Sequence, residues 1–487
     1  MSMNVLFVAS EAAPFAKTGG LGDVVGSLPK ALRQRGVDAR VLLPYYGFIR
    51  PDRYAIEPLF SFALPRRTGT AEVHLYHTEH EGVPIYFLKA WPYFGDGDYL
   101  YTDLDWDRPR FIFFCQAAMG MAWECATRLE WFPDLFHVHD WHTALLPFLV
   151  YDSRYHDRWA RTATMLTIHN MGYQGWDAGG YLWDAGVPAR HQPDLVYQNL
   201  TDNLLAIGLA YSDEITAVSP RYAIEIQYPR FGEGLQGIVR TRLNDLSGIL
   251  NGIDVVRYDP ATDPALPKNF SVECLDTRIE NKRALQREMG FEVRDDVPLI
   301  GMVSRLVESK GIDLAVPALR HILAADDVQL VALGTGKDTI EQDVWALGHY
   351  FHWKARTVIG FDAALAQRIY GGCDLFLMPS RYEPCGIGQM MAMRYGALPL
   401  VRETGGLADT VENYDGGPAE RGTGFVFLWE DPEAVIGTLR WATATYRYQK
   451  AAWRRMQVRA MSRDFSWDRS AGQYILRYER ALRKRRP

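Results

Sequence analysis

The chain has 487 residues, and this length predicts two or three domains rather than one. Its composition, 48% hydrophobic and 23% charged, indicates a globular protein with a sizeable core, while the formal net charge of -6 argues against broad binding to nucleic acid or to anionic membranes. The five cysteines are scattered without a CxxC pair and no apolar stretch reaches membrane-spanning length, so we expect a cytoplasmic protein rather than a disulfide scaffold, a zinc ribbon or a membrane protein.

The chain opens on a strand, a helix and a second strand around a glycine-rich turn. Residues 4–10 and 41–43 are apolar runs typical of buried strands, and apolar residues recur at helical spacing between them up to Gly36. The turn at 11–23 (EAAPFAKTGGLGD) contains five residues of interest, which are Lys17, Gly19, Gly20, Gly22 and Asp23. Glycines let the backbone approach an anion closely and a lysine adds a point charge, so this turn predicts an anion site. The GxGxxG pattern of a dinucleotide site is absent, and the second strand does not end in an acid, so that alternative is rejected.

Residues 91–107 (WPYFGDGDYLYTDLDWD) are aromatic and acidic without clear periodicity, which is typical of a long functional loop. Aspartates alternate at its end, at positions 103, 105 and 107, in the manner of a metal-binding DxD pair. An EF-hand loop starting there would need Gly at its sixth place and Glu at its twelfth, where this sequence has Arg108 and Phe114. We therefore interpret the segment as a solvated acidic loop in preference to a metal site.

Two further strand-like runs end in polar groups. Residues 135–140 end in Asp140, with His142 close behind, and residues 162–168 are followed by His169 and Asn170. The spacing HxHDxH is similar to the metallo-hydrolase pattern HxHxDH, but the Asp is displaced and no downstream ligand set is evident. We favour the interpretation that these side chains hydrogen-bond a polyol at the carboxyl edge of a sheet, and a metal-dependent hydrolase stays as an alternative.

The alternation of strands and helices restarts near residue 297, after a strand at 212–219 and a turn at NGID (251–254). This predicts a second doubly wound domain with a boundary near 252. Its expected strands are 298–303, 328–333, 357–359, 375–378, 398–401 and 424–427. Arg305 and Lys310, in SRLVESKG after the first of these strands, suit a diphosphate. Glycine turns are expected at 334–336 and at 404–407, the second opening a helix.

The stretch 374–396 (DLFLMPSRYEPCGIGQMMAMRYG) combines a buried strand, a turn and a helix at 386–395. Its turn places Glu383 and Cys385 at the carboxyl edge of a parallel sheet, ahead of a helix N-terminus that favours an anion. A carboxylate beside such a helix start suits a sugar joined to a phosphate. The alternative is a loop with a solvated glutamate and a buried cysteine.

Nine motifs occur together in a fixed order: KTGGLGD, HDWH, HN, NGID, SRLVESKG, SRYEPCGIGQ, AMRYG, RETGGLADTV and DFSW. In this combination the chain resembles the bacterial glycogen synthase and plant starch synthase family over almost its whole length. The resemblance implies an α/β fold of the GT-B type, with two Rossmann-like, doubly wound parallel-sheet domains facing across a cleft. It implies an N-terminal domain at 1–252 on the acceptor side, a C-terminal domain at 253–465 on the donor side, and a C-terminal helix within 466–487 that crosses back to the first domain.

The implied activity is transfer of glucose from ADP-glucose, or from UDP-glucose, to the non-reducing 4-OH of an α-1,4-glucan with retention of configuration. No metal and no other cofactor is implied. By the same resemblance, catalysis would fall to Glu383, His169, Arg305, Lys310 and Asp140. Donor binding would fall to Lys17, Gly19, Gly20, Asn251, Phe361, Cys385, Gly386, Thr404, Gly405 and Gly406. Acceptor binding would fall to Asp23, His142 and Asn170, with Lys17 able to serve either substrate.

Three positions depart from the family pattern. Gly388 stands where relatives often have Thr or a larger residue, Phe361 replaces a common Tyr, and Ala206 stands where relatives usually have Lys. Because these substitutions lie near the implied site, a glucan-binding relative without catalytic activity is a further alternative. We favour an active enzyme that uses ADP-glucose.

Overall fold

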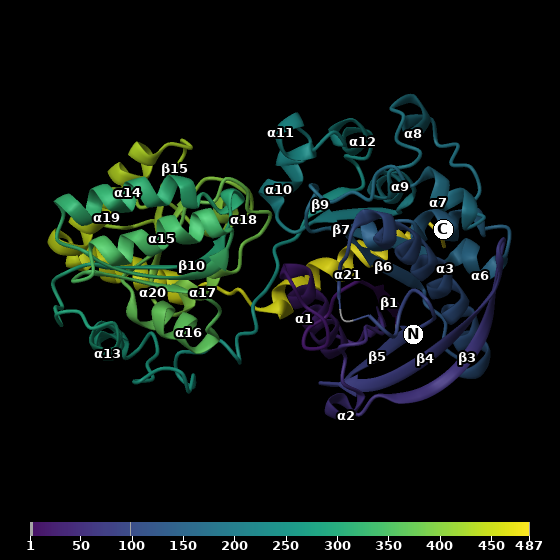
Figure 1. Cartoon of the computed structure of the whole chain (residues 1–487), viewed down its shortest axis with the longest axis horizontal. Coiled ribbons are helices and arrows are strands. Elements are labelled where there is room, and N and C mark those ends of the chain that lie inside the picture. The colour runs from purple at the N-terminus through teal and green to yellow at the C-terminus, as the bar shows by residue number, and fades with distance from the viewer. Residues whose placement is uncertain (1–2, 98, 487) are drawn as a thin grey trace. The chain divides into compact units, whose positions relative to one another are not determined.

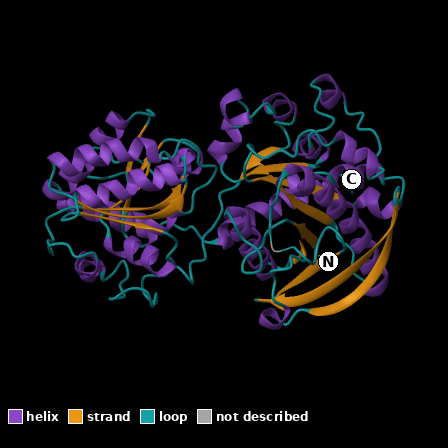
Figure 2. Cartoon of the chain, in the orientation of Figure 1, coloured by secondary structure: helices purple, strands orange, loops and turns teal. Residues whose placement is uncertain are grey.

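The computed structural model describes residues 3–97 and 99–486. The chain divides into two compact units, and we describe each by itself. Unit 1 comprises Met1–Gly252 together with Trp467–Pro487, and unit 2 comprises Ile253–Ser466. Each unit is a sheet with helices on both faces (Figures 1 and 2). No helix in the described part of the chain is both long enough and apolar enough to cross a membrane.

Unit 1 contains a nine-stranded sheet in the order β3-β4-β5-β2-β1-β6-β7-β8-β9. The strands are β1 (Asn4–Val8), β2 (Asp38–Pro44), β3 (Glu57–Arg66), β4 (Gly69–His80), β5 (Val83–Lys89), β6 (Leu135–His139), β7 (Ala163–Ile168), β8 (Glu214–Ala217) and β9 (Leu246–Gly248). Pairing is parallel from β5 to β9 and antiparallel on both sides of β4. The central strands β1, β6 and β7 are buried almost throughout, as expected for a parallel sheet covered on both faces.

The helices of unit 1 vary from single turns to the long α3. They are α1 (Gly20–Gln34), α2 (Pro51–Tyr54), α3 (Leu104–Arg128), α4 (Asp140–Thr143), α5 (Leu146–Asp152), α6 (Asp157–Arg161), α7 (Gly179–Asp184), α8 (Pro193–Tyr197), α9 (Leu204–Tyr211), α10 (Pro220–Glu225), α11 (Pro229–Gly232), α12 (Gln236–Thr241) and α21 (Trp467–Arg483). Helix α21 packs against α1, and the Arg35 guanidinium forms hydrogen bonds of 2.6 and 2.7 Å with the Asp468 carboxylate.

Unit 2 contains a six-stranded parallel sheet in the order β12-β11-β10-β13-β14-β15. The strands are β10 (Leu299–Leu306), β11 (Gln329–Gly336), β12 (Ala355–Ile359), β13 (Leu375–Met378), β14 (Leu398–Arg402) and β15 (Phe425–Phe427). The helices are η1 (Leu275–Arg278), α13 (Ile279–Glu288), η2 (Glu308–Lys310), α14 (Ile312–Ala325), α15 (Asp338–Tyr350), α16 (Ala363–Gly372), α17 (Gly388–Arg394), α18 (Gly405–Thr410), α19 (Pro432–Tyr448) and α20 (Lys450–Met461). The expected pair of doubly wound sheets is confirmed, as is the return of the C-terminal helix to the first unit.

Two expectations about local structure were wrong, and one pair of strands was not predicted. The curved antiparallel pair β3 and β4 at the edge of unit 1 was not predicted (Figure 1). Residues 334–336 form no turn, because they continue β11 in register with the end of β10. The acidic loop ends early, at the N-cap Asp103, because α3 begins at Leu104. Asp107 on this helix is not solvated but pairs with Arg110 at 2.6 Å in the interior. Residue 98 of that loop lies outside the described residues.

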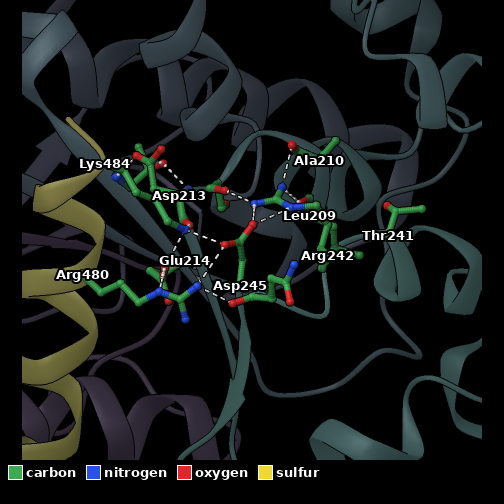
Figure 3. Close-up of polar contacts among 12 residues, drawn as sticks. Leu209, Ala210, Asp213, Glu214, Thr241, Arg242, Asp245, Arg480 and Lys484 are labelled. Atoms are coloured by element: carbon green, nitrogen blue, oxygen red, sulfur yellow. Dashed lines mark hydrogen bonds and ion pairs between the residues drawn. The ribbon is translucent and has the colours of Figure 1, made fainter. Parts of the chain in front are cut away.

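The basic residues at the C-terminal end form ion pairs with carboxylates around β8. Glu214, at the start of β8, is fully buried, and its carboxylate lies 2.6 Å from Lys484 Nζ and 3.3 Å from Arg480 Nε. Asp245 accepts from the same lysine at 2.6 Å, and Asp213 pairs with Arg485. Figure 3 shows Arg480 and Lys484 reaching from the α21 end of the chain to the carboxylates around β8. The end of the chain is therefore an anchor that holds α21 on unit 1.

Candidate functional site

The glycine-rich turn after β1 is organised by the carboxylate of Glu11, which is 4% exposed. Glu11 accepts hydrogen bonds from the N–H groups of Thr18 at 2.7 Å and Gly19 at 3.1 Å, and from the Tyr101 hydroxyl at 2.7 Å. Nothing lies within 4 Å of the place a Cβ would occupy on Gly19 or Gly20. The Glu11 carboxylate therefore holds the turn in place. Because Gly19 and Gly20 have no side chains, the backbone at the start of α1 is open to a ligand.

The other two charged side chains of this turn, Lys17 and Asp23, pair with each other. Lys17 Nζ lies 2.6 Å from Asp23 Oδ1, and their side chains are 45% and 36% exposed. Exposed ion pairs contribute little to stability. Lys17 can therefore exchange Asp23 for the anionic group of a ligand at small cost.

Asp140 joins the ends of two neighbouring strands. It follows β6 in a left-handed backbone conformation (φ 52°), and its Oδ1 accepts hydrogen bonds from the N–H of His169 at 2.7 Å and of Asn170 at 3.3 Å. Burial raises the pKa of Asp140 to about 7, although the two N–H groups act in the opposite direction. The carboxyl group thus fixes the loop after β7 and titrates near neutral pH.

A row of histidines lies beneath this loop. His139 Nδ1 is 3.0 Å from His169 Nε2, and the ring of His137 packs 4.3 Å from that of His139. His137 is itself held at both nitrogens, by the hydroxyl of Tyr478 on α21 at 2.8 Å and by that of Thr167 at 2.6 Å. Removal from water lowers the pKa of His169 to about 3, and burial lowers the pKa values of His137 and His139 well below the usual range. All three rings are therefore neutral at physiological pH.

The remaining predicted residues of unit 1 are partly or fully buried. His142 stacks on Tyr101 with 4.8 Å between ring centroids, and its Nδ1 has no hydrogen-bond partner within the described residues. Asn170 Oδ1 accepts from the N–H of Gly172 at 2.9 Å. Asn251, 5% exposed, has an Oδ1 without a partner among the described groups.

The HxHDxH pattern does not assemble a metal-ligand set. The ring nitrogens of His137 face Tyr478 and Thr167, and Asp140 faces backbone N–H groups. In the part of the chain that the structure describes, no three His, Cys, Asp or Glu side chains are placed to hold a metal ion. These residues are instead hydrogen-bonded to protein groups around the carboxyl edge of β6 and β7.

In unit 2, Glu383 is the centre of a compact polar group at the carboxyl edge of β10 and β13. Lys310 Nζ lies 2.8 and 2.6 Å from its two carboxylate oxygens, and the Ser380 hydroxyl donates to it at 2.9 Å. The side chain of Glu383 is 7% exposed and that of Lys310 is 19% exposed. A charged pair with this much desolvation interacts more strongly than a surface pair, and its geometry is correspondingly well defined.

Glycines at two positions of unit 2 allow the loops around Glu383 to pack backbone against backbone. Gly405 (φ 43°), at the start of α18, lies so close to the loop that a Cβ would be 2.0 Å from the carbonyl oxygen of Glu383. Gly311 (φ 66°) lies equally close to the carbonyl oxygen of Pro379. The carbonyl of Ser309 accepts from the N–H groups of Arg381 and Tyr382 at 3.0 and 3.1 Å. The η2 turn, the Glu383 loop and α18 are thus locked together.

The other predicted residues of unit 2 lie around this group with different exposures. Arg305 is exposed near the end of β10, and its guanidinium makes no hydrogen bond or ion pair with the described residues. Phe361, just after β12, is 91% exposed. Cys385 and the N-cap Thr404 are buried, and Gly386 (φ 74°) precedes α17. Among its described residues, unit 2 thus places the exposed Arg305, the exposed ring of Phe361 and the ion pair of Lys310 with Glu383 near the carboxyl ends of its strands.

Besides the exposed Phe361, the other two departures from the family pattern have these surroundings. A Cβ on Gly388 would lie 3.2 Å from Phe376 and 3.3 Å from Met378, so these side chains occupy the space a larger residue would need. Ala206 is fully buried in α9. Position 206 is therefore packed in the interior in this chain.

The structure gathers the predicted residues into two sets, one in each unit. Lys17, the turn glycines, Asp140, His169 and Asn170 lie at the carboxyl edge of β1, β6 and β7, and Arg305, Lys310 and Glu383 lie at that of β10 and β13. Sequence reasoning missed Glu11 and Ser380, which complete these sets. For Ser380 the signal was its position three residues before the glutamate in SRYE, whereas the role of Glu11 depends on a turn geometry that the sequence does not reveal.

Comparison with known proteins identifies relatives over nearly the full length of the chain. Residues 4–241 match the family model described as "Starch synthase catalytic domain", and residues 288–452 match "Glycosyl transferases group 1". The chain is 44% identical over 485 residues to the glycogen synthase of Streptococcus sanguinis, covering 99% of this chain and 100% of the relative. It is 42% identical to the glycogen synthase of Moorella thermoacetica, covering 99% and 98%.

Solved structures also resemble this chain over nearly its full length. The catalytic domain of starch synthase IV from Arabidopsis thaliana, bound to ADP and acarbose, superposes with a TM-score of 0.89 at 32% identity, covering 99% of this chain and 100% of that one. Sucrose-phosphate synthase from Thermosynechococcus elongatus has the same fold, with a TM-score of 0.62 at 16% identity. The chain therefore belongs to the glycogen synthase and starch synthase family of GT-B glycosyltransferases.

Proposed function

We propose that this protein is a glycogen synthase that transfers glucose from ADP-glucose to the non-reducing 4-OH of an α-1,4-glucan, with retention of the anomeric configuration. Its similarity to bacterial glycogen synthases over nearly the whole chain supports the reaction. A starch synthase relative solved with ADP and acarbose supports ADP-glucose as donor and a glucan as acceptor.

The observation that carries the proposal is the buried group of Lys310, Glu383 and Ser380 in unit 2. Cleavage of the bond between glucose and diphosphate places negative charge on the leaving group and oxocarbenium character on the sugar. Lys310 supplies a fixed positive charge for the leaving group. Arg305 supplies a guanidinium that no carboxylate of the described residues occupies. Glu383 binds the glucose hydroxyls and stabilises the electron-poor sugar. In this scheme it is not a nucleophile, because both of its oxygens are held by Lys310.

The other donor contacts follow from the same arrangement. Phe361 presents an exposed ring on which the base can stack. Cys385, Gly386, Thr404, Gly405 and Gly406 shape the loop around the donor, and Asn251 adds a further polar contact. The donor preference for ADP-glucose over UDP-glucose belongs to the same proposal.

Unit 1 supplies the groups for the reacting sugar and the acceptor. The backbone of Gly19 and Gly20 and the ammonium of Lys17 bind anionic or hydroxyl groups, and the neutral ring of His169 lies beside the reacting sugar. Asp140 acts on the acceptor side, together with Asp23, His142 and Asn170. We also propose a cytoplasmic location, since all five cysteines are free thiols, which fits a reducing compartment.

Offering ADP-glucose and UDP-glucose separately, with glycogen as acceptor, and measuring nucleotide release tests this function. We expect glycogen-dependent release that is faster with ADP-glucose. A folded protein that releases no nucleotide from either donor would show a non-catalytic glucan-binding relative, and faster release from UDP-glucose would reverse the donor assignment.

A further inference from the structure

The hydrogen bond between two neutral imidazole rings constrains where their protons are. Between His139 Nδ1 and His169 Nε2, which are 3.0 Å apart, one nitrogen must carry the proton and the other must accept it. Each neutral ring has a single N–H. The direction of this hydrogen bond therefore also decides whether Nδ1, the other nitrogen of His169, carries a proton.

The surroundings of His139 favour one of the two arrangements. His139 Nε2 is buried and has no hydrogen-bond partner among the described residues. If His169 donated, His139 would have to carry its proton on this nitrogen, as a buried N–H without an acceptor, which is rare in folded proteins. If His139 donates from Nδ1, the same nitrogen carries only a lone pair. His169 then accepts at Nε2 and carries its proton at Nδ1, which makes no hydrogen bond within the described residues.

The ring of His139 is held so that its Nδ1 continues to face His169. It stacks on Phe7 at 5.6 Å with 19° between the ring planes, and packs on its other neighbour, His137, at 4.3 Å. His137 is bonded in turn to Thr167 and to Tyr478 of the C-terminal helix. These contacts oppose a rotation of the His139 ring that would turn Nδ1 away from His169.

We propose that His139 is a positioning residue, which sets the tautomer of His169 so that His169 presents an Nδ1–H donor to an oxygen of the reacting sugar. The proposal rests on the proposed function for the role of His169, but the tautomer itself follows from the contacts of His139. His139 does not touch the substrate. It acts through the proton that it places on its neighbour.

Two variants at one position separate the hydrogen bond from the packing. His139→Asn keeps an N–H donor near the position of Nδ1, and His139→Leu removes it while keeping an apolar side chain in a buried site. We expect kcat of the Leu variant to fall by about tenfold or more, with little change in KM for ADP-glucose, by analogy with the loss of about 10-fold to 100-fold when a group that orients a metal-binding histidine is removed. We expect the Asn variant to stay close to the wild type. Urea unfolding midpoints of both variants verify that they are folded.

The tautomer is read directly from two-bond proton–nitrogen spectra of the full chain labelled with ¹⁵N-histidine, in which the His169 signals are those lost in His169→Asn. We expect the Nδ1–H form in the wild type and in His139→Asn, and a shift toward the Nε2–H form in His139→Leu. An Nε2–H form in the wild type, or an unchanged tautomer in His139→Leu, would overturn the inference. If instead His169→Asn retained full turnover, the proposed role of His169 would fail while the spectra would still decide the tautomer.

Discussion

The pair formed by Lys310 and Glu383 allows a prediction in which the two partners respond differently. Replacing Lys310 by Ala leaves a carboxylate that is 7% exposed, with Ser380 as its remaining hydrogen-bond donor. Removing one partner of a buried pair lowers the free energy of unfolding by about 3 to 5 kcal/mol. For Lys310→Ala we expect the lower figure of about 3 kcal/mol, because the Lys310 side chain is itself 19% exposed. Glu383→Gln leaves a partly exposed ammonium and an amide oxygen that still accepts, so its expected cost is only about 1 kcal/mol.

Both substitutions are expected to lower kcat by about 100-fold to 1000-fold, because each removes a charge positioned for the transition state. Urea unfolding and ADP release with glycogen measure the two effects on the same samples. Lys337→Ala is the matched control, since Lys337 forms a 2.8 Å pair with Glu308 in the same unit but both side chains are more than half exposed. This control should leave the unfolding midpoint unchanged. Wild-type turnover in Lys310→Ala, or a larger loss of stability in Glu383→Gln than in Lys310→Ala, would refute the reasoning.

Three further predictions concern the scaffold. The pKa of Asp140 in the folded protein is about 7, above its unfolded value, so its contribution to stability is complete below about pH 4 and is lost as the pH rises through 7. Asp140→Asn should remove this part of the pH dependence of urea unfolding. An unchanged pH profile would contradict the raised pKa. Lys484→Ala should cost about 2 kcal/mol of unfolding free energy, because Glu214 would remain fully buried and keep only the longer ion pairs with Arg480 at 3.3 Å and Arg477 at 3.9 Å among the described residues. An unchanged midpoint would show that the C-terminal anchor is not needed. Gly405→Ala should abolish ADP release, because its Cβ would collide with the carbonyl of Glu383; normal activity would show that the loop can move aside.

The sheets and the loops that carry the site were predictable from local sequence. Apolar runs such as residues 375–378 correspond to buried parallel strands, and the motif loops follow those strands at their carboxyl ends. The first domain was expected to begin with a strand, a helix and a parallel strand, and β1, α1 and β2 have that arrangement. These features depend on composition and periodicity within short windows, which the sequence displays directly.

Features that depend on distant residues could not be predicted. Glu11, which organises the glycine turn, accepts a hydrogen bond from the distant Tyr101, and His137 is bonded to Tyr478, 341 residues away. The C-terminal basic residues appear solvated in the sequence because their partner, Glu214, lies on a strand far away in the chain. The start of α3 is different, since the spacing of three residues between Asp107 and Arg110 is a local helical signal in the sequence itself.

The stereochemistry of the product tests the central claim most directly. A short α-1,4-glucan incubated with ADP-glucose and the enzyme should gain glucose units at its non-reducing end, one for each ADP released. Proton spectra of the extended chain should show the new anomeric signals as α-linked, and a glucosidase specific for α-1,4 bonds should remove the added units. New β-linked signals, or release of free glucose in place of chain extension, would contradict a retaining glucan synthase.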